Sequence, residues 1–275
     1  MKILIIGANG FLGRNLVRKC LELNWKVDCV YHNKKEFIPK QCSSVHIDDL
    51  EKLEDSYNAV FLVAAFIPED KSVLDQKLLD VNIVVPLRVS AKFKKSKIIF
   101  SSSASVYGVH DSIISENSSF NNPDNYALSK LSAECILKFS SSYRIVRFSS
   151  IYGQGQTLKT FIPKLLEQAK VNKKLTLFGT GARLQNYIYI EDAVGYLIAA
   201  VSPKVSGIYL GVAGRSYSNT EVAGIIQNLV PGCKIQYRGE DNSPDFVYDN
   251  SYSQKILKFK PRFSLEEGIG EMLNG

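Results

Sequence analysis

A glycine-rich turn close to the N-terminus constrains the fold of this chain more than any other feature of its sequence. Residues 3–6 form a short apolar run of strand length, and Gly7, Gly10 and Gly13 follow it in the spacing GxxGxxG. A pattern of apolar residues with helical spacing then begins. Glycines let a ligand approach the backbone closely, and the N-terminus of a helix attracts phosphate. We therefore predict a dinucleotide-binding turn formed by Gly7, Asn9, Gly10, Phe11, Leu12 and Gly13.

Apolar runs of strand length alternate with helical patterns through the first half of the chain. The strand-like runs are residues 27–31, 45–47, 59–65, 97–101 and 143–148, and the helical patterns include residues 81–94 and 125–140. Strands that are apolar throughout, and that alternate with helices, indicate a parallel sheet covered by helices on both faces. The predicted fold class is α/β, with a Rossmann-like doubly wound parallel sheet.

The pattern becomes less regular after Tyr152, where short strands and helices predict a second, smaller lobe. A chain of 275 residues is long enough for one large α/β domain and such a lobe. We predict a dinucleotide-binding domain at residues 1–155, with a returning segment at about 188–205. Residues 156–187 and 206–275 are expected to form an interleaved C-terminal α/β lobe that binds the substrate.

Composition excludes several classes of function. The five cysteines are irregularly spaced, which argues against a disulfide framework and favours a reducing compartment, so we expect a cytoplasmic protein. The three histidines show no metal-ligand spacing, and the longest apolar stretch, residues 59–68, is too short to cross a bilayer. The net charge of +7 indicates a lysine-rich surface or a field that attracts polyanionic ligands. No nucleic-acid signature accompanies it, and we expect neither nucleic-acid nor membrane partners.

The residues after the second predicted strand bear on the choice of cofactor. NAD-specific sites usually place an acidic residue there for the ribose hydroxyls. This chain has Tyr31, His32, Asn33, Lys34 and Lys35 instead, and no carboxylate that would repel a 2′-phosphate. His32 and Lys34 are therefore candidate cofactor contacts. The sequence favours NADP(H), with NAD as the alternative.

A serine, a tyrosine and a lysine form the candidate catalytic set. Tyr126 and Lys130 are four residues apart in a helical pattern, so both face the same side of the helix. A cation beside a phenol favours the phenolate and lowers the pKa of the tyrosine, which can then exchange a proton with a sugar hydroxyl. Ser103 lies in a serine-rich segment directly after an apolar strand, where its hydroxyl can bind the same reacting oxygen.

Taken together, these features resemble the extended short-chain dehydrogenase/reductase family of NAD(P)-dependent nucleotide-sugar epimerases, dehydratases and ketoreductases. The resemblance continues through residues 147–153, 179–192 and 260–268 and so covers nearly the whole chain. It implies a Ser103–Tyr126–Lys130 triad, a lobe that holds the nucleotide diphosphate of a sugar, and a homodimer formed by the helix of Tyr126 and the helix at residues 81–94. Further expected cofactor contacts are Asp49, Leu50, Ala64, Ala65, Asn82, Ser101, Tyr126, Lys130 and Phe148.

Several positions depart from the pattern of this family. Val63 replaces a common histidine, Ser150 replaces an asparagine that often meets the substrate, and Gln185 replaces an arginine that commonly meets the nucleotide phosphates. Arg183 lies two residues before Gln185, and in an extended segment it shares a face with it and can supply the charge. The expected substrate-binding residues are Phe66, Ser103, Ser105, Ser150, Arg183 and Gln185.

The sequence favours one reaction and leaves others open. Dehydratases of the family carry an Asp–Glu pair where this chain has Ala104 and Ser105, so elimination lacks its acid and base. Reduction of a keto group on a nucleotide-activated sugar, with NADPH consumed, is our main hypothesis. A 4-epimerase with tightly bound NAD is the first alternative. A non-catalytic dinucleotide-sensing protein and a reductase for a substrate without a nucleotide are the others.

Overall fold

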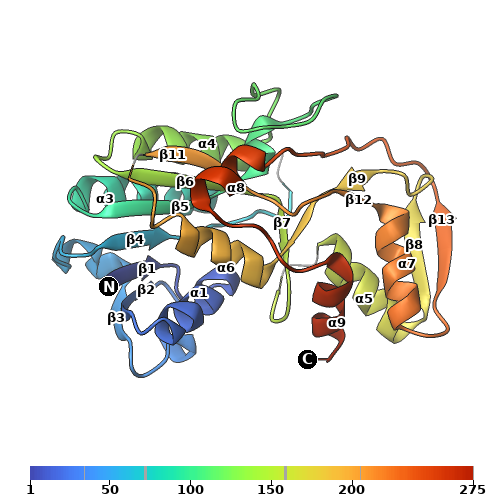
Figure 1. The fold of residues 1–275 in the computed structure, drawn as a ribbon, viewed down its shortest axis with the longest axis horizontal. Helices are drawn as coiled ribbons and strands as arrows, with labels where there is room; N and C mark the ends of the chain where they lie inside the picture. Colours follow the sequence, from blue (N-terminus) through green and yellow to red (C-terminus); the bar gives the residue numbers. More distant parts are fainter. Residues whose placement is uncertain (34, 71–72, 158–159, 205, 275) are drawn as a thin grey trace.

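The computed structural model describes residues 1–33, 35–70, 73–157, 160–204 and 206–274. Figure 1 shows a large lobe that contains the N-terminus and a smaller lobe that contains the C-terminus. Among the described helices, none has both the length and the apolar character needed to span a membrane.

The large lobe is built on a sheet of seven parallel strands within the described residues. In sequence order the strands are β1 (Lys2–Ile6), β2 (Lys26–Tyr31), β3 (Ser43–His46), β4 (Ala59–Leu62), β5 (Lys97–Ser103), β6 (Tyr143–Phe148) and β11 (Gly207–Gly211). Their spatial order is β11-β6-β5-β4-β1-β2-β3. Successive strands are added on one side of β1 and then, from β4 on, on its other side, so the order of the strands reverses between β1 and β4. In doubly wound sheets ligands bind outside the carboxyl ends of the strands at this reversal. The expected Rossmann-like α/β fold is confirmed.

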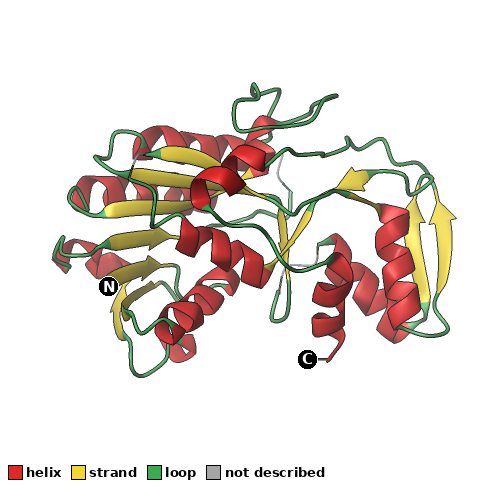
Figure 2. Cartoon of the chain, viewed as in Figure 1, coloured by secondary structure: helices red, strands yellow, loops and turns green. Residues whose placement is uncertain are grey.

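Helices cover both faces of this sheet (Figure 2). One face packs against α1 (Phe11–Glu22) and α6 (Ile190–Ala199), and the other against α3 (Val85–Lys92) and α4 (Asn125–Leu137). The helix predicted at residues 81–94 starts earlier, because α2 (Gln76–Leu79) is capped by Asp75 and continues through a π-helical turn, Asp80–Val84. Pro86 follows that turn and lacks the N–H that a regular helix would use.

The small lobe combines one two-stranded sheet with three helices. Parallel strands β8 (Lys174–Phe178) and β13 (Lys234–Arg238) pack with α5 (Phe161–Val171), α7 (Asn219–Leu229) and α9 (Leu265–Asn274). Ser218 caps α7 and forms a capping box with Glu221. Two short strand pairs, β7 (Ser150–Tyr152) with β10 (Tyr187–Tyr189) and β9 (Leu184–Gln185) with β12 (Tyr217–Ser218), lie between the lobes.

The strand pairing of β11 bears on the expected start of the second small-lobe segment at residue 206. Residues 206–275 were assigned to the small lobe, yet β11 is hydrogen-bonded to β6 at the edge of the large sheet. The short helix α8 (Ser251–Leu257) is also tied to β11, because the Ser253 hydroxyl accepts from the Leu210 N–H at 2.6 Å. We propose that the large lobe comprises residues 1–155 and about 188–211, and that α8 packs back onto it.

Candidate active site

The glycine turn joins β1 to α1 in a conformation that depends on its glycines. Gly7 has a φ of +90°, and a Cβ added there would lie 2.6 Å from the backbone nitrogen of Ala64. A Cβ on Gly13 would lie 2.0 Å from the Gly7 carbonyl oxygen. Helix α1 begins with no side-chain cap and no acidic residue in its first turn. Its first N–H groups are therefore free to bind an anion, and the turn fits the pyrophosphate of a dinucleotide.

The other predicted residues of this turn differ in their surroundings. The Asn9 side-chain amide donates to the Asn33 carbonyl oxygen and so ties the turn to the loop after β2. Leu12 is buried in the core, whereas Phe11 is only partly buried. Ala64 packs directly over Gly7, and Ala65 is exposed beyond it. The turn and the end of β4 therefore form one wall at the reversal of the sheet.

The end of β2 carries no carboxylate among its described residues. Its exposed His32 lies beside His46, whose ring nitrogen contacts the His32 carbonyl oxygen at 2.8 Å. Lys34 lies outside the described residues. Asp28, the acidic residue within β2, accepts a hydrogen bond from the Tyr57 hydroxyl at 3.0 Å and pairs with Lys2. Asp28 is thus engaged by Tyr57 and Lys2, away from the strand end.

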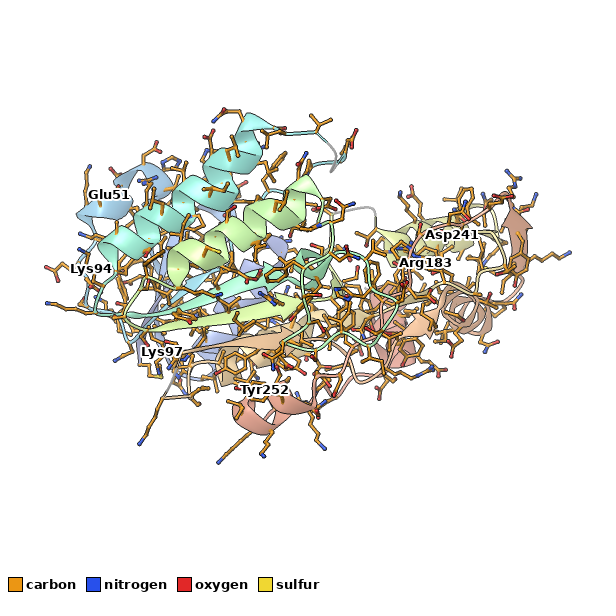
Figure 3. The ribbon with its side chains drawn as sticks, turned by 90° about the horizontal axis from the view of Figure 1, so that it is seen from above. Glu51, Lys94, Lys97, Arg183, Asp241 and Tyr252 are labelled. Carbon is orange, nitrogen blue, oxygen red and sulfur yellow. The ribbon has the colours of Figure 1, made fainter. Side chains whose placement is uncertain are left out.

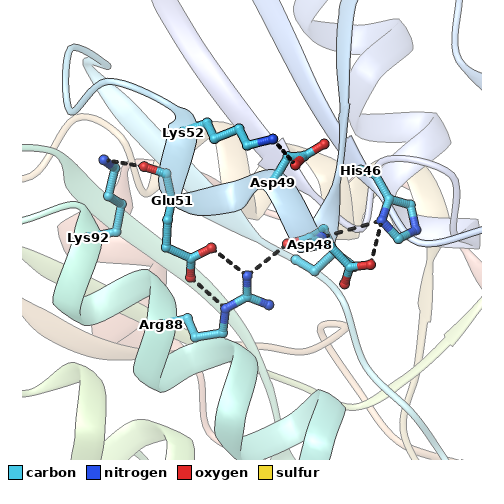
Figure 4. Close-up of polar contacts among 8 residues, drawn as sticks. His46, Asp48, Asp49, Glu51, Lys52, Arg88 and Lys92 are labelled. Atoms are coloured by element: carbon cyan, nitrogen blue, oxygen red, sulfur yellow. Dashed lines mark hydrogen bonds and ion pairs between the residues drawn. The ribbon is translucent and has the colours of Figure 1, made fainter.

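The two residues expected near the adenine, Asp49 and Leu50, lie on a short helix, Ile47–Lys52, after β3. Figure 4 shows its polar contacts: Asp49 forms an ion pair with Lys52 at 2.7 Å, and the neighbouring Glu51 pairs with Arg88. Leu50 is fully buried, so its side chain belongs to the core. Asp49 remains accessible, and Leu50 offers a ligand only its backbone.

Ser103, Tyr126 and Lys130 lie together at the carboxyl end of β5. The Ser103 side chain hydrogen-bonds to the Tyr126 side chain and, at 2.8 Å, to the Ser105 hydroxyl. The ammonium of Lys130 lies 4.1 Å from the centre of the Phe100 ring. Tyr126 and Lys130 are both buried. The structure thus brings the predicted catalytic set into one cluster.

The protonation states of this cluster differ from the sequence expectation. Burial raises the pKa of Tyr126 to about 12, the charge of Asp124 adds to this, and the Ser103 hydrogen bond opposes it. Burial lowers the pKa of Lys130 to about 7, against the carboxylate of Glu134. The expected lowering of the tyrosine pKa by the lysine is not found, because burial dominates at both side chains.

Buried hydrogen bonds fix the start of α4, where Tyr126 lies. Asp124 caps the helix by accepting from the Ala127 N–H at 2.8 Å, and the Ser129 hydroxyl donates to the Tyr126 carbonyl at 2.7 Å. The Asn82 amide donates to Ser129 at 3.0 Å and exchanges two 2.9 Å hydrogen bonds with the Phe66 backbone. Asn82 therefore connects the loop after β4 to the catalytic helix, a contact that sequence reasoning did not identify.

The remaining predicted residues of the large lobe lie along the same edge. Ser101 is half-buried in β5, two residues before Ser103. Phe148 is buried at the end of β6, where Gly211 leaves room for its ring. Ser150 begins β7, and its N–H donates to the Asn186 carbonyl at 3.2 Å.

In the small lobe the predicted substrate residues diverge. Arg183 donates to the Pro244 carbonyl at 3.1 Å and lies next to Asp241 (Figure 3). Gln185 donates instead to Asn219 at the start of α7, at 2.9 Å. Arg183 contributes to a shallow cavity whose lining residues are Thr180, Gly181, Ala182, Arg183, Asp241, Ser243 and Asp245. The two side chains therefore contact different segments, and Arg183 borders the cavity.

Sequence reasoning missed Tyr187. Its hydroxyl is buried and has no hydrogen-bond partner within the described residues. Burial raises the pKa of Tyr187 and the charge of Arg183 opposes the shift, which puts the guanidinium near this hydroxyl. All three residues of β10 are buried, so the sequence pattern gives no sign of a polar role for Tyr187. A buried hydroxyl without a partner beside a cation is an uncommon feature of a protein core.

No group of three or more histidine, cysteine or acidic side chains is arranged for a metal ion within the part of the chain that the structure describes. The five cysteines are all free.

Comparisons with known proteins agree with this geometry. A model of the NAD dependent epimerase/dehydratase family matches residues 3–209. A putative UDP-glucose 4-epimerase of Methanocaldococcus jannaschii is 27% identical, over 99% of this chain and 97% of the relative. A UDP-N-acetyl-alpha-D-glucosaminuronate decarboxylase of Bacillus cytotoxicus is 25% identical, over 99% of this chain and 96% of the relative. Relatives of similar length thus carry different reaction names.

The fold also resembles solved structures. The UDP-glucuronic acid 4-epimerase of Bacillus cereus, solved in complex with UDP-glucuronic acid and NAD, superposes with a TM-score of 0.88. The alignment covers 100% of this chain and 98% of that protein at 23% identity, which supports a shared fold.

Proposed function

Since this chain belongs to the NAD-dependent epimerase/dehydratase family, we propose that it epimerises a nucleotide-activated sugar and keeps its NAD bound through the reaction. The relatives named as UDP-sugar 4-epimerases support this proposal. They favour the alternative that the sequence left open over the reductase that it placed first.

One observation carries the proposal: the Ser103–Tyr126 pair with Lys130 one helical turn away, and no carboxylate at the two positions after Ser103. The neighbouring Ala104 is buried, and Ser105 hydrogen-bonds to Ser103. Such a set can move one proton to and from a sugar oxygen, but it has no second acid or base for elimination of water. Oxidation to a ketone and reduction from the other face need only this proton transfer and a hydride carrier.

In the proposed reaction Tyr126 accepts the proton of the sugar hydroxyl and later returns one to the ketone oxygen. The Ser103 hydroxyl holds the same oxygen by a hydrogen bond, which its contact with Tyr126 allows. Lys130, one helical turn from Tyr126, is the cation of this set, and burial lowers its pKa to about 7. Bound NAD would accept a hydride from the sugar carbon and give it back. Gly7, Gly10 and Gly13 would hold its pyrophosphate at the start of α1.

A reductase that consumes NADPH is the second candidate, favoured by the end of β2. His32, Asn33 and Lys35 follow the strand, and the first carboxylate after it is that of Glu36, so the strand end itself would not repel a 2′-phosphate. The NAD-bound structures of similar fold give this candidate no support.

For the substrate we propose a nucleoside diphosphate sugar bound between the lobes. Arg183 would meet the diphosphate, and Gln185 and Ser150 would add neutral hydrogen bonds. Phe66 and Ser105 would border the sugar near Ser103. The UDP-sugars found in similar structures support this class of substrate.

We also propose a cytoplasmic homodimer. The apolar side chains of Val84, Leu87 and Leu128 are exposed. Val84 lies in the π-helical turn and Leu87 in α3, and both segments pack against α4, which carries Leu128. Together they offer an apolar surface for a second copy. Sedimentation that shows only monomer at micromolar concentration would rule the dimer out.

The proposed function is tested by incubating the purified protein, with no cofactor added, with UDP-glucose, UDP-glucuronic acid and UDP-N-acetylglucosamine. Proton NMR of the sugar nucleotides should show the 4-epimer of at least one of them, and Tyr126→Phe should form none. A 4-keto-sugar nucleotide reduced at the expense of NADPH, with no epimer formed, would replace the proposal with the reductase.

A further inference from the structure

Behind the catalytic set lies a buried ion pair that the proposed reaction does not use. The Glu134 carboxylate on α4 accepts from the Arg147 guanidinium on β6 at 2.6 Å and 3.0 Å, and from the Ser102 hydroxyl on β5 at 2.6 Å. The side chains of Arg147 and Glu134 are 2% and 0% exposed. We call Ser102, Glu134 and Arg147 the Glu134 clamp.

The clamp is connected to every element that carries a catalytic side chain. Glu134 follows Lys130 by one helical turn and Tyr126 by two, so all three lie on one face of α4. Ser102 directly precedes Ser103 and pairs in register with Arg147. The Arg147 guanidinium also lies 4.7 Å from the ring centre of Tyr107, in the turn that Ser103 caps.

Stability alone does not account for this arrangement. Burial would lower the pKa of Arg147, but the hydrogen bonds and charge of Glu134 outweigh it and the pKa is raised. Removing two charges from water costs about as much as their attraction returns, and apolar side chains of similar volume often serve a fold as well. Hydrogen bonds, however, are directional, and here they join α4 to β5 and β6. They therefore fix the rotation and the axial position of α4, which non-directional apolar contacts would leave free.

We propose that the Glu134 clamp positions the catalytic set, by holding α4 against β5 and β6 and by placing a negative charge one helical turn from Lys130 on the same face of α4. Glu134 and Arg147 are thus positioning residues, and the proposal rests on the proposed function for its effect on turnover. The charged or titratable groups around Lys130 are Tyr126 and Glu134 on its own helix. Arg147 on β6 and Tyr107 lie behind Glu134.

The effect on Lys130 has a definite sign. The Glu134 carboxylate raises the pKa of Lys130 against burial, which lowers it to about 7. Without this carboxylate the lysine would lose its proton at a lower pH, and less of it would be charged at neutral pH. In a variant without the Glu134 carboxylate, the alkaline limb of the pH–rate profile should therefore shift to lower pH.

The test compares Glu134→Gln with the double variant Glu134→Met/Arg147→Met. The single variant keeps the shape of the side chain but leaves a buried guanidinium without its counter-charge, so it can fail to fold. The double variant removes both charges and leaves only the buried Ser102 hydroxyl without its acceptor, so it should fold with a modestly lowered thermal midpoint. We expect it to bind NAD within twofold of wild type and to lose at least tenfold in turnover, with an acid-shifted limb. Equal turnover with an unchanged profile would overturn the proposal.

A second readout does not depend on activity. In protein labelled with ¹³Cε-lysine, the Lys130 resonance is assigned by its loss in Lys130→Met and titrated by NMR. It should titrate near pH 7 in wild type and at least half a pH unit lower in the double variant. An unchanged titration overturns the charge role even if no test sugar reacts, and failure of wild type to epimerise any sugar refutes only the proposed function.

Glu51→Gln is the matched control. Glu51 forms the same two-bond contact with Arg88, at 2.6 Å and 2.7 Å, but on the surface (Figure 4). This variant should leave turnover, NAD binding and the Lys130 titration unchanged. A loss equal to that of the clamp variant would mean that any broken ion pair has the same effect, and would also overturn the proposal.

Discussion

The two lobes hold their candidate functional side chains in different ways. In the large lobe Ser103 ends strand β5 and Tyr126 lies in the first turn of α4. A continuous buried network of hydrogen bonds through Asn82 and Ser129 fixes this helix. Near the small lobe, Gln185 lies in a strand of only two residues that Arg183 directly precedes, and the Arg183 side chain donates to a loop carbonyl.

The difference suggests a division of labour. A proton transfer needs its groups held within a fraction of an ångström, which buried networks in a rigid sheet provide. Recognition of a sugar nucleotide is less demanding, because a cation at position 183 could serve in place of the arginine expected at position 185 on the same short, partly exposed segment. Changes in the large lobe should therefore affect the reaction with any substrate, and changes in the small lobe the choice and affinity of substrate.

Removal of the Tyr126 hydroxyl should have the largest effect. Tyr126→Phe keeps the ring in place but leaves no group to exchange the proton, so turnover should fall by about 10³-fold, within the range of general acid–base catalysis. NAD affinity, measured by calorimetry, should stay within twofold. A variant that retains a third of wild-type turnover would remove Tyr126 from the reaction.

Blocking the glycine turn should affect the cofactor and, through it, everything else. In Gly13→Val the new Cβ would lie 2.0 Å from the Gly7 carbonyl oxygen, so the turn must move away from the start of α1. NAD affinity should fall by about 100-fold, because the displaced N–H groups no longer meet the pyrophosphate. Gly224→Ala, where a Cβ meets no atom within 4 Å, is the control and should bind NAD normally.

The buried ammonium of Lys130 should destabilise the folded protein. Its pKa is lowered from 10.5 to about 7, so below pH 7 the folded protein holds a buried charge that the unfolded chain exposes to water. Between pH 7 and 10.5 the folded state releases this proton first, and wild-type stability should rise with pH. Lys130→Met should raise the free energy of unfolding by about 2 kcal/mol at pH 6, and by less at pH 9.

Denaturant melts of wild type, Lys130→Met and Lys94→Met at these two pH values test this prediction. Lys94 is exposed, and its substitution should have no pH-dependent effect. A Lys130→Met variant that is less stable than wild type at pH 6 would show that the buried ammonium does not destabilise the folded protein.

The smallest effect is expected in the small lobe. Arg183→Ala should raise the KM for a UDP-sugar by about tenfold, the value of one charge-assisted contact to phosphate, and leave NAD affinity unchanged. Arg238→Ala changes an exposed arginine of the same lobe and should do neither. An unchanged KM in Arg183→Ala would leave the small lobe without its phosphate contact and would weaken the division of labour proposed above.

The large lobe was predictable because its signals are local. The turn at Gly7, the spacing of Tyr126 and Lys130 and the apolar strands can each be read within a dozen residues. Residues 59–65 were expected to form one strand, but β4 ends at Leu62 because the Val63 and Ala64 N–H groups both turn toward the Ile6 carbonyl. Local patterns set the elements, and tertiary hydrogen bonds set where they end.

Features built from distant segments were not predictable. The strand β11 contains only a few apolar residues between glycines and gains its place by pairing with β6. The cavity beside Arg183 needs residues 180–183 and 241–245 together. The Glu134–Arg147 pair joins a helix to a strand, and a glutamate in a helical pattern suggests solvent exposure rather than burial.

The most direct test of the proposed function is the cofactor that the purified protein carries. The protein is denatured after exhaustive dialysis, and the released nucleotides are identified and counted by chromatography. An epimerase that recycles its cofactor should release close to one NAD per chain, and the native protein should epimerise a UDP-sugar with none added. Release of no dinucleotide, together with tight binding of NADPH and not of NAD, would contradict the proposal and restore the reductase.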